Sequence, residues 1–478
     1  MLLIPMVAAL ASCEKFLDQQ PISDLSSDKF WLTPGDAELG MAGIYSGVQD
    51  VFNTGYIEWG DARSDNFTYS GTGDAQINNS INAVTTTMGE TNWSNFYKVI
   101  GRANLAIKHL PEITELGAEE RDHYLAQAYA LRAYMYFFLV KLWGDAPLWL
   151  EPYGDIAQDA NLERTPAAEV LQQVVIPDLN KAADLINPDA ENVWEVNLGG
   201  ILAMQTDVYM WIKDYEQALA ASARLIQLER YQLAPAEAWK SLFLQPSTDN
   251  GNIWSLNRIY LQDGPESITR RISSANLSPQ YVMDPSVYEQ FESNPNDIRA
   301  KQTYDSLLFA NQAGNPNSLN KRLGKYHEMN PDGSFIYPNT TESESKLPLY
   351  RLADILLLRA EAFNMTGNKP EAFVLLNQVR ERAGLDPLNE ADYASPRDVE
   401  TAILEERQLE LFAECKRWFD LVRTGRVIEV MDPIIQERRA QLGMTPEGFG
   451  DERKILLPLH RTVLTNNPAL VQNPPYSN

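Results

Sequence analysis

Residues 201–226 read ILAMQTDVYMWIKDYEQALAASARLI, and residues 355–380 read ILLLRAEAFNMTGNKPEAFVLLNQVR. When the two stretches are aligned, both carry apolar residues at helical spacing on each side of a short polar turn, which predicts a pair of helices in each. Ala218 and Ala372 take the same place in the second helix, where a small side chain lets paired helices approach closely. This pattern favours tetratricopeptide-like units, which bury their faces by stacking on neighbours. A bundle of generic helical hairpins is the alternative.

The helical pattern continues outward from these stretches over most of the chain. In residues 118–142 apolar and aromatic side chains recur at three- and four-residue steps, and Gly144 follows as a helix-ending residue. The two quoted stretches belong to helix pairs predicted at 198–230 and 350–384, and further pairs are predicted at 96–142 and 396–425. We therefore predict an all-α protein built on a tetratricopeptide-like helical-repeat scaffold.

Two stretches lack this helical pattern. Residues 244–346 are rich in Pro, Asn, Gly and Ser but keep many aromatic residues, and residues 55–93 have the same character. Polar loops that carry aromatic residues are typical of a binding surface. We call 55–93 the first excursion and 244–346 the second, and we read both as long irregular loops on the helical scaffold. The chain then divides into an N-terminal region, 13–243, and a C-terminal region, 244–478.

The composition excludes several classes of function. The 478 residues include 40 basic and 65 acidic side chains, for a net charge of −25. This charge argues against a nucleic-acid binder, which needs a basic face for the phosphates. It also argues against a protein that docks directly on anionic lipid, which needs a basic patch. Hydrophobic residues make up 44% of the chain, which is enough for a large core. Its two cysteines exclude a disulfide scaffold and a cysteine-rich zinc site.

The first twelve residues, MLLIPMVAALAS, are apolar and too short to span a bilayer. They are typical of a signal peptide, although the positive residues that normally come first are missing, and we expect an earlier start codon. Leu10-Ala11-Ser12-Cys13 matches a bacterial lipobox, which predicts cleavage after residue 12 and a lipid anchor on Cys13. A buried N-terminal helix is the alternative. Cys415, in an amphipathic segment, is then expected to be a buried structural thiol.

Catalytic and cofactor motifs are missing from the sequence. There is no Walker A loop, no HExxH and no G-x-S-x-G elbow, and the four histidines have no metal-ligand spacing. Glu58, Asp61 and Asp65 cluster in one segment, but an acidic chain produces such clusters easily, and solvated or ligand-binding carboxylates are favoured over a glycosidase pair. We expect no metal and no cofactor other than the lipid on Cys13.

A series of motifs extends in order from Cys13 to the C-terminus. They read CEKFLDQQP at 13–21, W-x-x-x-Y-x-x-I-x-x-x-N at 93–104, YRLAD at 350–354, EERQLEL at 405–411 and RWFDLVR at 417–423. Together they resemble the SusD/RagB family of outer-membrane nutrient-uptake lipoproteins of Bacteroides-type bacteria. The resemblance implies an α-helical fold with tetratricopeptide-like units and a lipid-anchored protein at the cell surface. It further implies that the protein caps a SusC-like TonB-dependent β-barrel transporter and captures glycan, or sometimes peptide, without being an enzyme.

Glycan contacts are expected from the two excursions, because sugar faces pack on flat aromatic rings while their hydroxyls bond to polar side chains. The expected contacts are Asp61, Arg63, Asp65, Asn66 and Tyr69 in the first excursion, with Trp254 and Tyr281 in the second. Residues 63–66 resemble the family's R-x-D-N loop. Trp143, Trp211 and Trp418 lie in periodic helices and are expected to be structural, and Trp93 could serve either role.

The charged residues of 405–423, with Tyr350, Arg351 and Glu361, are expected to form helix-surface ion pairs and packing contacts rather than a site. Two other functions stay open at this point. One is a peptide- or protein-binding scaffold that uses the concave face of the helical repeats. The other is a surface glycoside hydrolase, against which the missing catalytic motifs argue.

Overall fold

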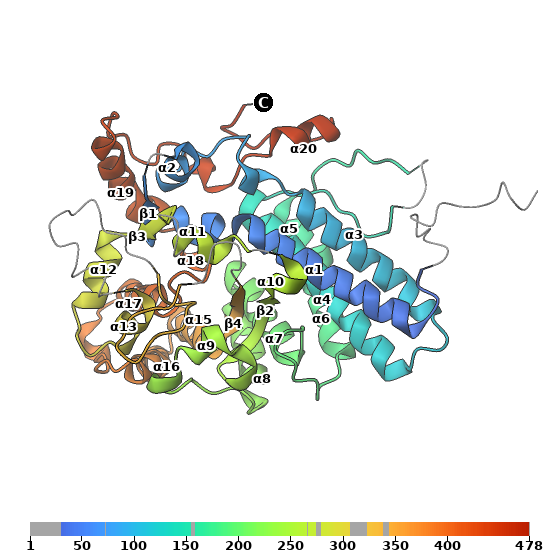
Figure 1. Ribbon diagram of the computed structural model, residues 1–478, viewed down its shortest axis with the longest axis horizontal. Coiled ribbons are helices and arrows are strands. Elements are labelled where there is room, and N and C mark those ends of the chain that lie inside the picture. Colours follow the sequence, from blue (N-terminus) through green and yellow to red (C-terminus); the bar gives the residue numbers. More distant parts are fainter. Residues whose placement is uncertain are drawn as a thin grey trace, which may run out of the picture.

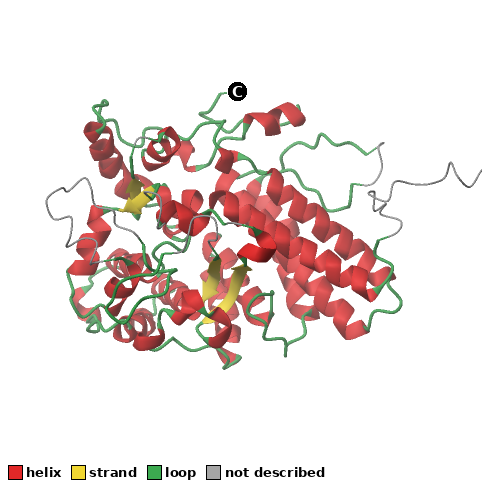
Figure 2. Cartoon of the chain, in the orientation of Figure 1, coloured by secondary structure: helices red, strands yellow, loops and turns green. Residues whose placement is uncertain are grey.

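The computed structural model is mostly helical, with two short β-ribbons (Figures 1 and 2). It describes residues 30–71, 73–153, 158–264, 266–273, 279–305, 323–337 and 344–477. The predicted signal peptide and the lipid attachment at Cys13 lie outside these ranges. None of the helices within them is long and apolar enough to cross a bilayer.

A helical bundle forms the N-terminal part, on the right of Figure 1. Its long helices are α1 (Pro34–Ile57), α3 (Ser94–His109), α4 (Ala118–Trp143), α6 (Ile176–Leu185) and α7 (Leu198–Trp211). Helix α3 packs between α1 and α4, and α4 also contacts α6. The helix α1 begins with a capping box, in which Thr33 and Asp36 satisfy each other's backbone N–H groups. The helix α4 is buried from Ala126 to Trp143, which makes it the central element of this bundle.

The two repeated stretches form two stacked helix pairs. The first pair is α7 with α8 (Tyr215–Gln227), and the second is α15 (Leu352–Met365) with α16 (Lys369–Arg382). Ala218 and Ala372 are buried where the helices of each pair meet. The helix α15 also packs against α7, α8 and α17 (Pro396–Glu410), so neighbouring pairs cover one another's apolar faces. This stacking confirms the predicted tetratricopeptide-like scaffold.

The last part of the chain returns to the N-terminal bundle. After α18 (Arg417–Arg423) and α19 (Val427–Gln441), it runs past α20 (Arg461–Asn466), which lies above the bundle in Figure 1. The backbone N–H of Leu457 donates to the carbonyl of Leu142 at 2.8 Å, and the indole of Trp143 donates to the carbonyl of Pro458 at 3.1 Å. The Asn473 amide donates to the carbonyl of Trp143 at 2.9 Å. These bonds satisfy the groups at the end of α4, which Gly144 terminates at φ +76°.

The excursions contain more regular structure than their composition indicates. The ribbon of β1 (Phe67–Tyr69) and β3 (Tyr281–Met283) joins the two excursions, and the ribbon of β2 (Asn252–Arg258) and β4 (Ser345–Arg351) joins the second excursion to α15.

Short helices lie both in the excursions and in the rest of the described chain. They are η3 (Glu58–Ala62), α2 (Asp74–Ser80), η4 (Gly89–Thr91), η5 (Leu110–Glu112), α5 (Ala167–Val170), η6 (Leu171–Val175), η7 (Ala236–Ala238), α9 (Ser241–Leu244), η8 (Pro246–Thr248), α10 (Tyr260–Asp263), α11 (Ile268–Ile272), α12 (Pro285–Glu292), α13 (Ile298–Thr303), η10 (Glu390–Asp392) and η11 (Glu452–Ile455).

Most of the charged residues of 405–423 are buried, with Glu405 an exposed exception, so ion pairs and packing contacts are present as predicted but their expected place on the helix surface is wrong. Arg351 is buried and pairs with Glu410 at 3.0 Å and with Glu414 at 2.8 Å. Arg407 pairs with Asp354 and Asp420, each at 2.8 Å. A charge buried in this way is tolerated because each group meets more than one partner, which offsets the cost of leaving water. These pairs hold α15, α17 and α18 together.

Candidate functional site

The two excursions meet at the β1–β3 ribbon, in the upper left of Figure 1. Tyr69 lies opposite Tyr281 in the antiparallel register. The pairing extends beyond the strands, because Ser70 N–H donates to the Gln280 carbonyl at 2.9 Å and Asp284 N–H donates to the Asn66 carbonyl at 2.9 Å. Sequence segments more than 200 residues apart thus form one small surface.

All of the predicted contact residues except Tyr69 are buried. The buried ones are Asp61, Arg63, Asp65, Asn66, Trp254 and Tyr281. Each of these side chains is surrounded by protein, so contact with a glycan would require the interior to open. Asp61, Arg63, Asp65, Asn66 and Tyr281 instead lie in the interior next to the ribbon, and Trp254 of β2 lies in the core.

Asp61 and Asn66 connect the first excursion to the segment that follows α17. The Asn66 amide donates to one Asp61 carboxylate oxygen at 2.7 Å, and Cys415 N–H donates to the other at 2.8 Å. Gln408 in turn donates to the Asn66 side-chain oxygen at 3.0 Å. Burial raises the pKa of Asp61 to about 7, against the opposing effect of these hydrogen bonds and of the Lys325 charge. Cys415 is buried, as predicted.

Arg63 and Asp65 use their charges to connect the first excursion to α18. Arg63 stacks on Trp418 at 4.1 Å and donates to the Asn82 side chain and to the Lys454 carbonyl, each at 2.9 Å. Asp65 accepts two bonds from the Arg417 guanidinium at 2.8 and 2.7 Å. Burial alone would raise the pKa of Asp65, but the Arg417 charge holds it below its usual value.

The carboxylate cluster noted in the sequence is not a free pair. Glu58 is buried and pairs with Arg271, and Asp61 and Asp65 have the partners given above. A hydrolytic pair of carboxylates would face a substrate across a gap. The three groups instead bond to other parts of the protein interior.

The predicted aromatic contacts from the second excursion are core residues. Trp254, on β2, is fully buried and meets Tyr134 edge to face, with ring centroids 5.0 Å apart. The Tyr281 hydroxyl accepts from the Asn79 amide at 3.1 Å, beneath the ribbon. Trp93, Trp143 and Trp418 are also buried, which gives all three a structural role.

Tyr69 is the one predicted contact that is partly exposed. Partial burial raises the pKa of its hydroxyl, despite the nearby Arg438 charge, so the group is neutral at physiological pH. Gln280 lies opposite Ser70, the residue after Tyr69, and its side-chain amide reaches that of Gln76 at 3.4 Å. Sequence reasoning missed both glutamines, whose only signal was their position in polar stretches next to the aromatic residues.

The ribbon therefore offers one aromatic ring together with hydroxyl and amide groups. The partly or fully exposed side chains here are Thr68, Tyr69, Ser70, Asp74, Gln76, Gln280 and Val282. Within the described part of the chain, no group of three or more His, Cys, Asp and Glu side chains could hold a metal ion. Such a surface can pack on the face of a neutral ligand and exchange hydrogen bonds with its hydroxyls.

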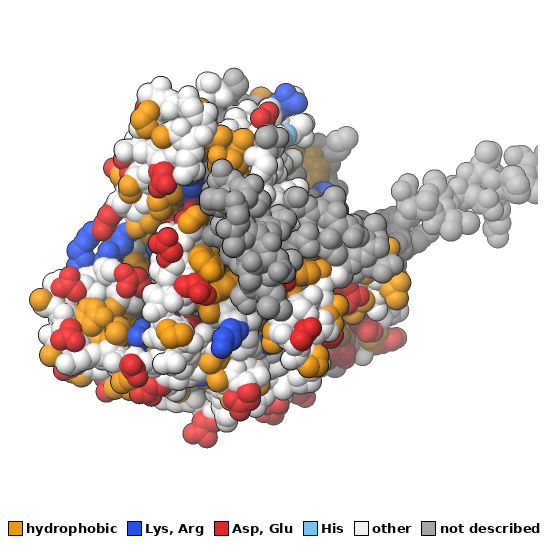
Figure 3. All heavy atoms as spheres, turned by 60° about the vertical axis from the view of Figure 1, so that its left-hand side comes forward, with side chains coloured by type: hydrophobic (Ala, Val, Ile, Leu, Met, Phe, Trp, Pro, Cys, Tyr) orange, Lys and Arg blue, Asp and Glu red, His pale blue; other side chains and the backbone are white. Residues whose placement is uncertain are grey.

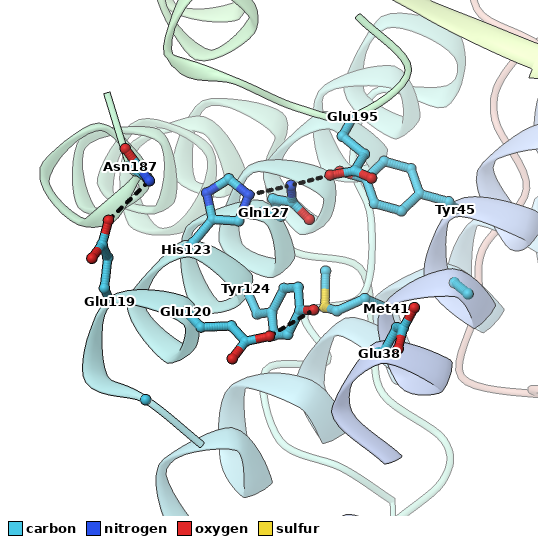
Figure 4. A pocket seen from close by; sticks show the side chains of 12 residues that line it. Glu38, Met41, Tyr45, Glu119, Glu120, His123, Tyr124, Gln127, Asn187 and Glu195 are labelled. Carbon is cyan, nitrogen blue, oxygen red and sulfur yellow. Dashed lines mark hydrogen bonds between the residues drawn. The ribbon is translucent and has the colours of Figure 1, made fainter. Parts of the chain in front are cut away.

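A separate open hollow of about 650 Å³ lies between α1 and the start of α4 (Figure 4). Glu38, Glu119, Glu120 and Glu195 line it, with no Lys or Arg among its lining residues. Several of these groups already bond to neighbours, since Glu119 accepts from Asn187 at 3.0 Å and the Gln127 amide donates to Glu195 at 3.2 Å. The hollow shares no residue with the ribbon.

On one face of the molecule (Figure 3), the distribution of charge fits the expected exclusion of nucleic acid. On the face shown in Figure 3, Lys and Arg side chains are spread among acidic ones and form no continuous basic stripe. A duplex or single strand would need such a stripe along its phosphates.

Comparisons with known proteins agree over nearly the whole chain. The SusD family model matches residues 282–476, and a model described as "Starch-binding associating with outer membrane" matches residues 15–198. SusD-like protein P38 of Formosa agariphila is 32% identical over 99% of this chain and 98% of its own length. A SusD-like protein of Bacteroides ovatus is 22% identical over 87% of this chain and 81% of its own.

Solved structures share the fold. A SusD superfamily protein from Bacteroides thetaiotaomicron has a TM-score of 0.76 at 20% identity, covering 92% of this chain and 100% of its own. A laminarin-binding SusD-like protein has a TM-score of 0.74 at 23% identity, covering 93% of this chain and 100% of its own. These likenesses confirm the predicted helical fold.

Proposed function

Because this chain belongs to the SusD/RagB family, we propose that it binds a nutrient glycan at the β1–β3 ribbon and delivers it to a SusC-like TonB-dependent outer-membrane transporter. The observation that carries the proposal is the ribbon itself, which joins the two excursions and leaves Tyr69 of the first and Gln280 of the second partly or fully exposed at its end. The laminarin-binding protein of the same fold supports a glycan as the ligand class.

The chemistry of the ribbon suits a neutral sugar. The C–H face of a pyranose ring packs on an aromatic ring such as that of Tyr69, which loses little rotamer freedom on binding. The amides of Gln76 and Gln280 both donate and accept, as sugar hydroxyls do. Their mutual contact, at 3.4 Å, is weak, so little is lost when a ligand replaces it.

The proposed setting is the outer membrane at the cell surface, with acyl chains on Cys13 as the anchor. The lipobox at residues 10–13 supports this, as does the family description that names association with the outer membrane. More than one acyl chain is needed for stable anchoring, and a bacterial lipoprotein cysteine carries several. The tether would let the ribbon meet the transporter without a basic patch on the protein.

We propose binding without hydrolysis. The clustered carboxylates of the first excursion are buried and bonded to other protein groups, and the matching family model and one structural neighbour are named for starch and laminarin binding. The acid and the base or nucleophile of a glycosidase would have to face one sugar from opposite sides. Among the exposed side chains named above at and next to the ribbon, one is a carboxylate, that of Asp74 on α2.

The test uses the mature chain with Cys13→Ala, so that the protein is soluble. Isothermal titration against a panel of oligosaccharides, including laminarin fragments, is paired with a reducing-sugar assay and a peptide panel. We expect binding to at least one glycan and no release of reducing ends. Tight peptide binding with no sugar bound, or hydrolysis, would refute the proposal.

The site is tested with Tyr69→Ala. Loss of one stacking ring costs about 1 kcal/mol, so the affinity should fall about fivefold to tenfold. Tyr153→Ala is the matched control, because Tyr153 is an exposed tyrosine outside the ribbon. Equal affinities for both variants would place the glycan elsewhere.

A further inference from the structure

The side chain of Arg438 contacts both excursions next to the β1–β3 ribbon. Arg438, on α19, is buried, and its guanidinium donates to the Ser80 carbonyl and to the Phe67 carbonyl, each at 2.8 Å. It also pairs with the Asp284 carboxylate at 2.7 Å. Ser80 ends α2, Phe67 begins β1 and Asp284 follows β3. A single planar group thus holds the end of α2 and both strands of the ribbon at once.

Asp284 extends this connection. One of its carboxylate oxygens accepts from Arg438, while the other accepts from the Ser286 N–H and caps α12. Its own N–H donates to the Asn66 carbonyl at 2.9 Å, next to β1. The position of the second excursion relative to the first therefore depends on the two charged groups, Arg438 and Asp284.

We propose that Arg438 is a positioning residue, which does not touch the ligand but sets how Tyr69 and Gln280 lie relative to each other. This inference rests on the proposed ligand site at the ribbon. The fork of the guanidinium is essential, because it aims separate N–H groups at two carbonyls and a carboxylate. A lysine ammonium keeps the charge but is a single point on a flexible stem, so it cannot hold all three partners in one geometry.

The structure offers a matched control on the same helix. Arg439 is the next residue and donates to the Thr445 carbonyl at 2.9 Å, with a weaker contact to Glu447 at 3.4 Å. Neither partner belongs to the ribbon. Arg438→Lys and Arg439→Lys make the same chemical change, so their difference isolates the effect on the ribbon.

The experiment measures glycan affinity by titration, well below the melting temperature, so that the folded fraction alone is sampled. Hydrogen exchange at the Ser70 and Asp284 amides, which bond across the ribbon, reports its local order. For Arg438→Lys we expect about a tenfold loss of affinity and about tenfold faster exchange at both amides. For Arg439→Lys we expect changes below about twofold.

A purely structural role gives a different result. If Arg438→Lys lowers the melting temperature but leaves affinity and exchange as in the wild type, the positioning role is overturned. Asp284→Asn serves as the second variant if Arg438→Lys does not fold, because the amide oxygen still caps α12 while the charge partner is lost. If the wild type binds no glycan, the proposed function fails, and the exchange measurement alone then decides whether Arg438 orders the ribbon.

Discussion

Replacing Gly60 by alanine should disturb the contact between the first excursion and the segment after α17. A Cβ atom at residue 60 would lie 2.4 Å from the Cα of Cys415 and 2.5 Å from its carbonyl carbon. Carbon atoms normally meet at about 3.5–4.0 Å, so one backbone has to move by about 1 Å. Cys415 is not free to move, because its N–H donates to Asp61 at 2.8 Å.

The size of the effect follows from three contributions. Overpacking costs about 1–3 kcal/mol, and loss of the bond between Cys415 and Asp61 adds about 1 kcal/mol. The substitution also stabilises the folded state by about 1 kcal/mol, because alanine favours helical backbone more than glycine does. The free energy of unfolding should therefore fall by about 1–3 kcal/mol, a large part of a typical total of about 5–15 kcal/mol.

Urea unfolding followed by tryptophan fluorescence measures this change, since Trp59 and Trp418 are fully buried close to the contact. Gly43→Ala is the control: Gly43 is also helical, and a Cβ there meets nothing within 4 Å. This control should be more stable than the wild type by about 0.5–1 kcal/mol. If Gly60→Ala unfolds at the same urea concentration as Gly43→Ala, the tight contact is absent and the role given to Asp61 is wrong.

Three further changes have defined outcomes. Arg417→Met leaves the buried Asp65 charge unpaired and should cost about 3–5 kcal/mol in urea unfolding at pH 7, with a smaller cost when Asp65→Asn is added. Because Arg417 lowers the pKa of Asp65, the stability from this pair is present above about pH 4 and is lost as the pH falls through the lowered value, so the two variants should converge with the wild type in acid. Burial lowers the pKa of Lys240 to about 7 from about 10.4 when unfolded, so the folded chain holds fewer protons between these values. The wild type should therefore gain stability relative to Lys240→Met as the pH rises from 7 to 9, with a slope that increases from about 0.7 to about 1.4 kcal/mol per pH unit, and a flat difference would contradict this. Cys13→Ala should move the protein from the membrane fraction to the soluble fraction, and unchanged fractionation would refute the lipid anchor.

The helical scaffold could be predicted because its signals are local. The apolar spacing in 201–226 and 355–380 is set by the helix period, and the small Ala218 and Ala372 mark where paired helices meet. Burial of Cys415 was predicted for the same reason, since it lies on the apolar side of an amphipathic segment. These conclusions need only the residues within one or two turns.

The site could not be predicted in the same way, because its polar residues have distant partners. Asp65 lies in a polar stretch that looks solvent-exposed, yet its partner Arg417 is about 350 residues further along the chain. Trp254 looks like a loop aromatic, yet β2 pairs with β4 and brings it against Tyr134. Of the seven expected contacts, only Tyr69 reaches the surface. The resemblance of residues 63–66 to the family's R-x-D-N loop stays a prediction, and the structure gives the buried Arg63, Asp65 and Asn66 a supporting role.

The contact of residues 457–473 with the end of α4 has a consequence for the order of folding. The carbonyls of Leu142 and Trp143 accept from Leu457 and Asn473, which follow them by more than 300 residues in the chain. The N-terminal bundle therefore cannot satisfy these carbonyls through local contacts, and closing so long a loop is slow. Completion of the bundle thus depends on a segment that is far away in sequence, so the two ends of the described chain fold as one cooperative unit.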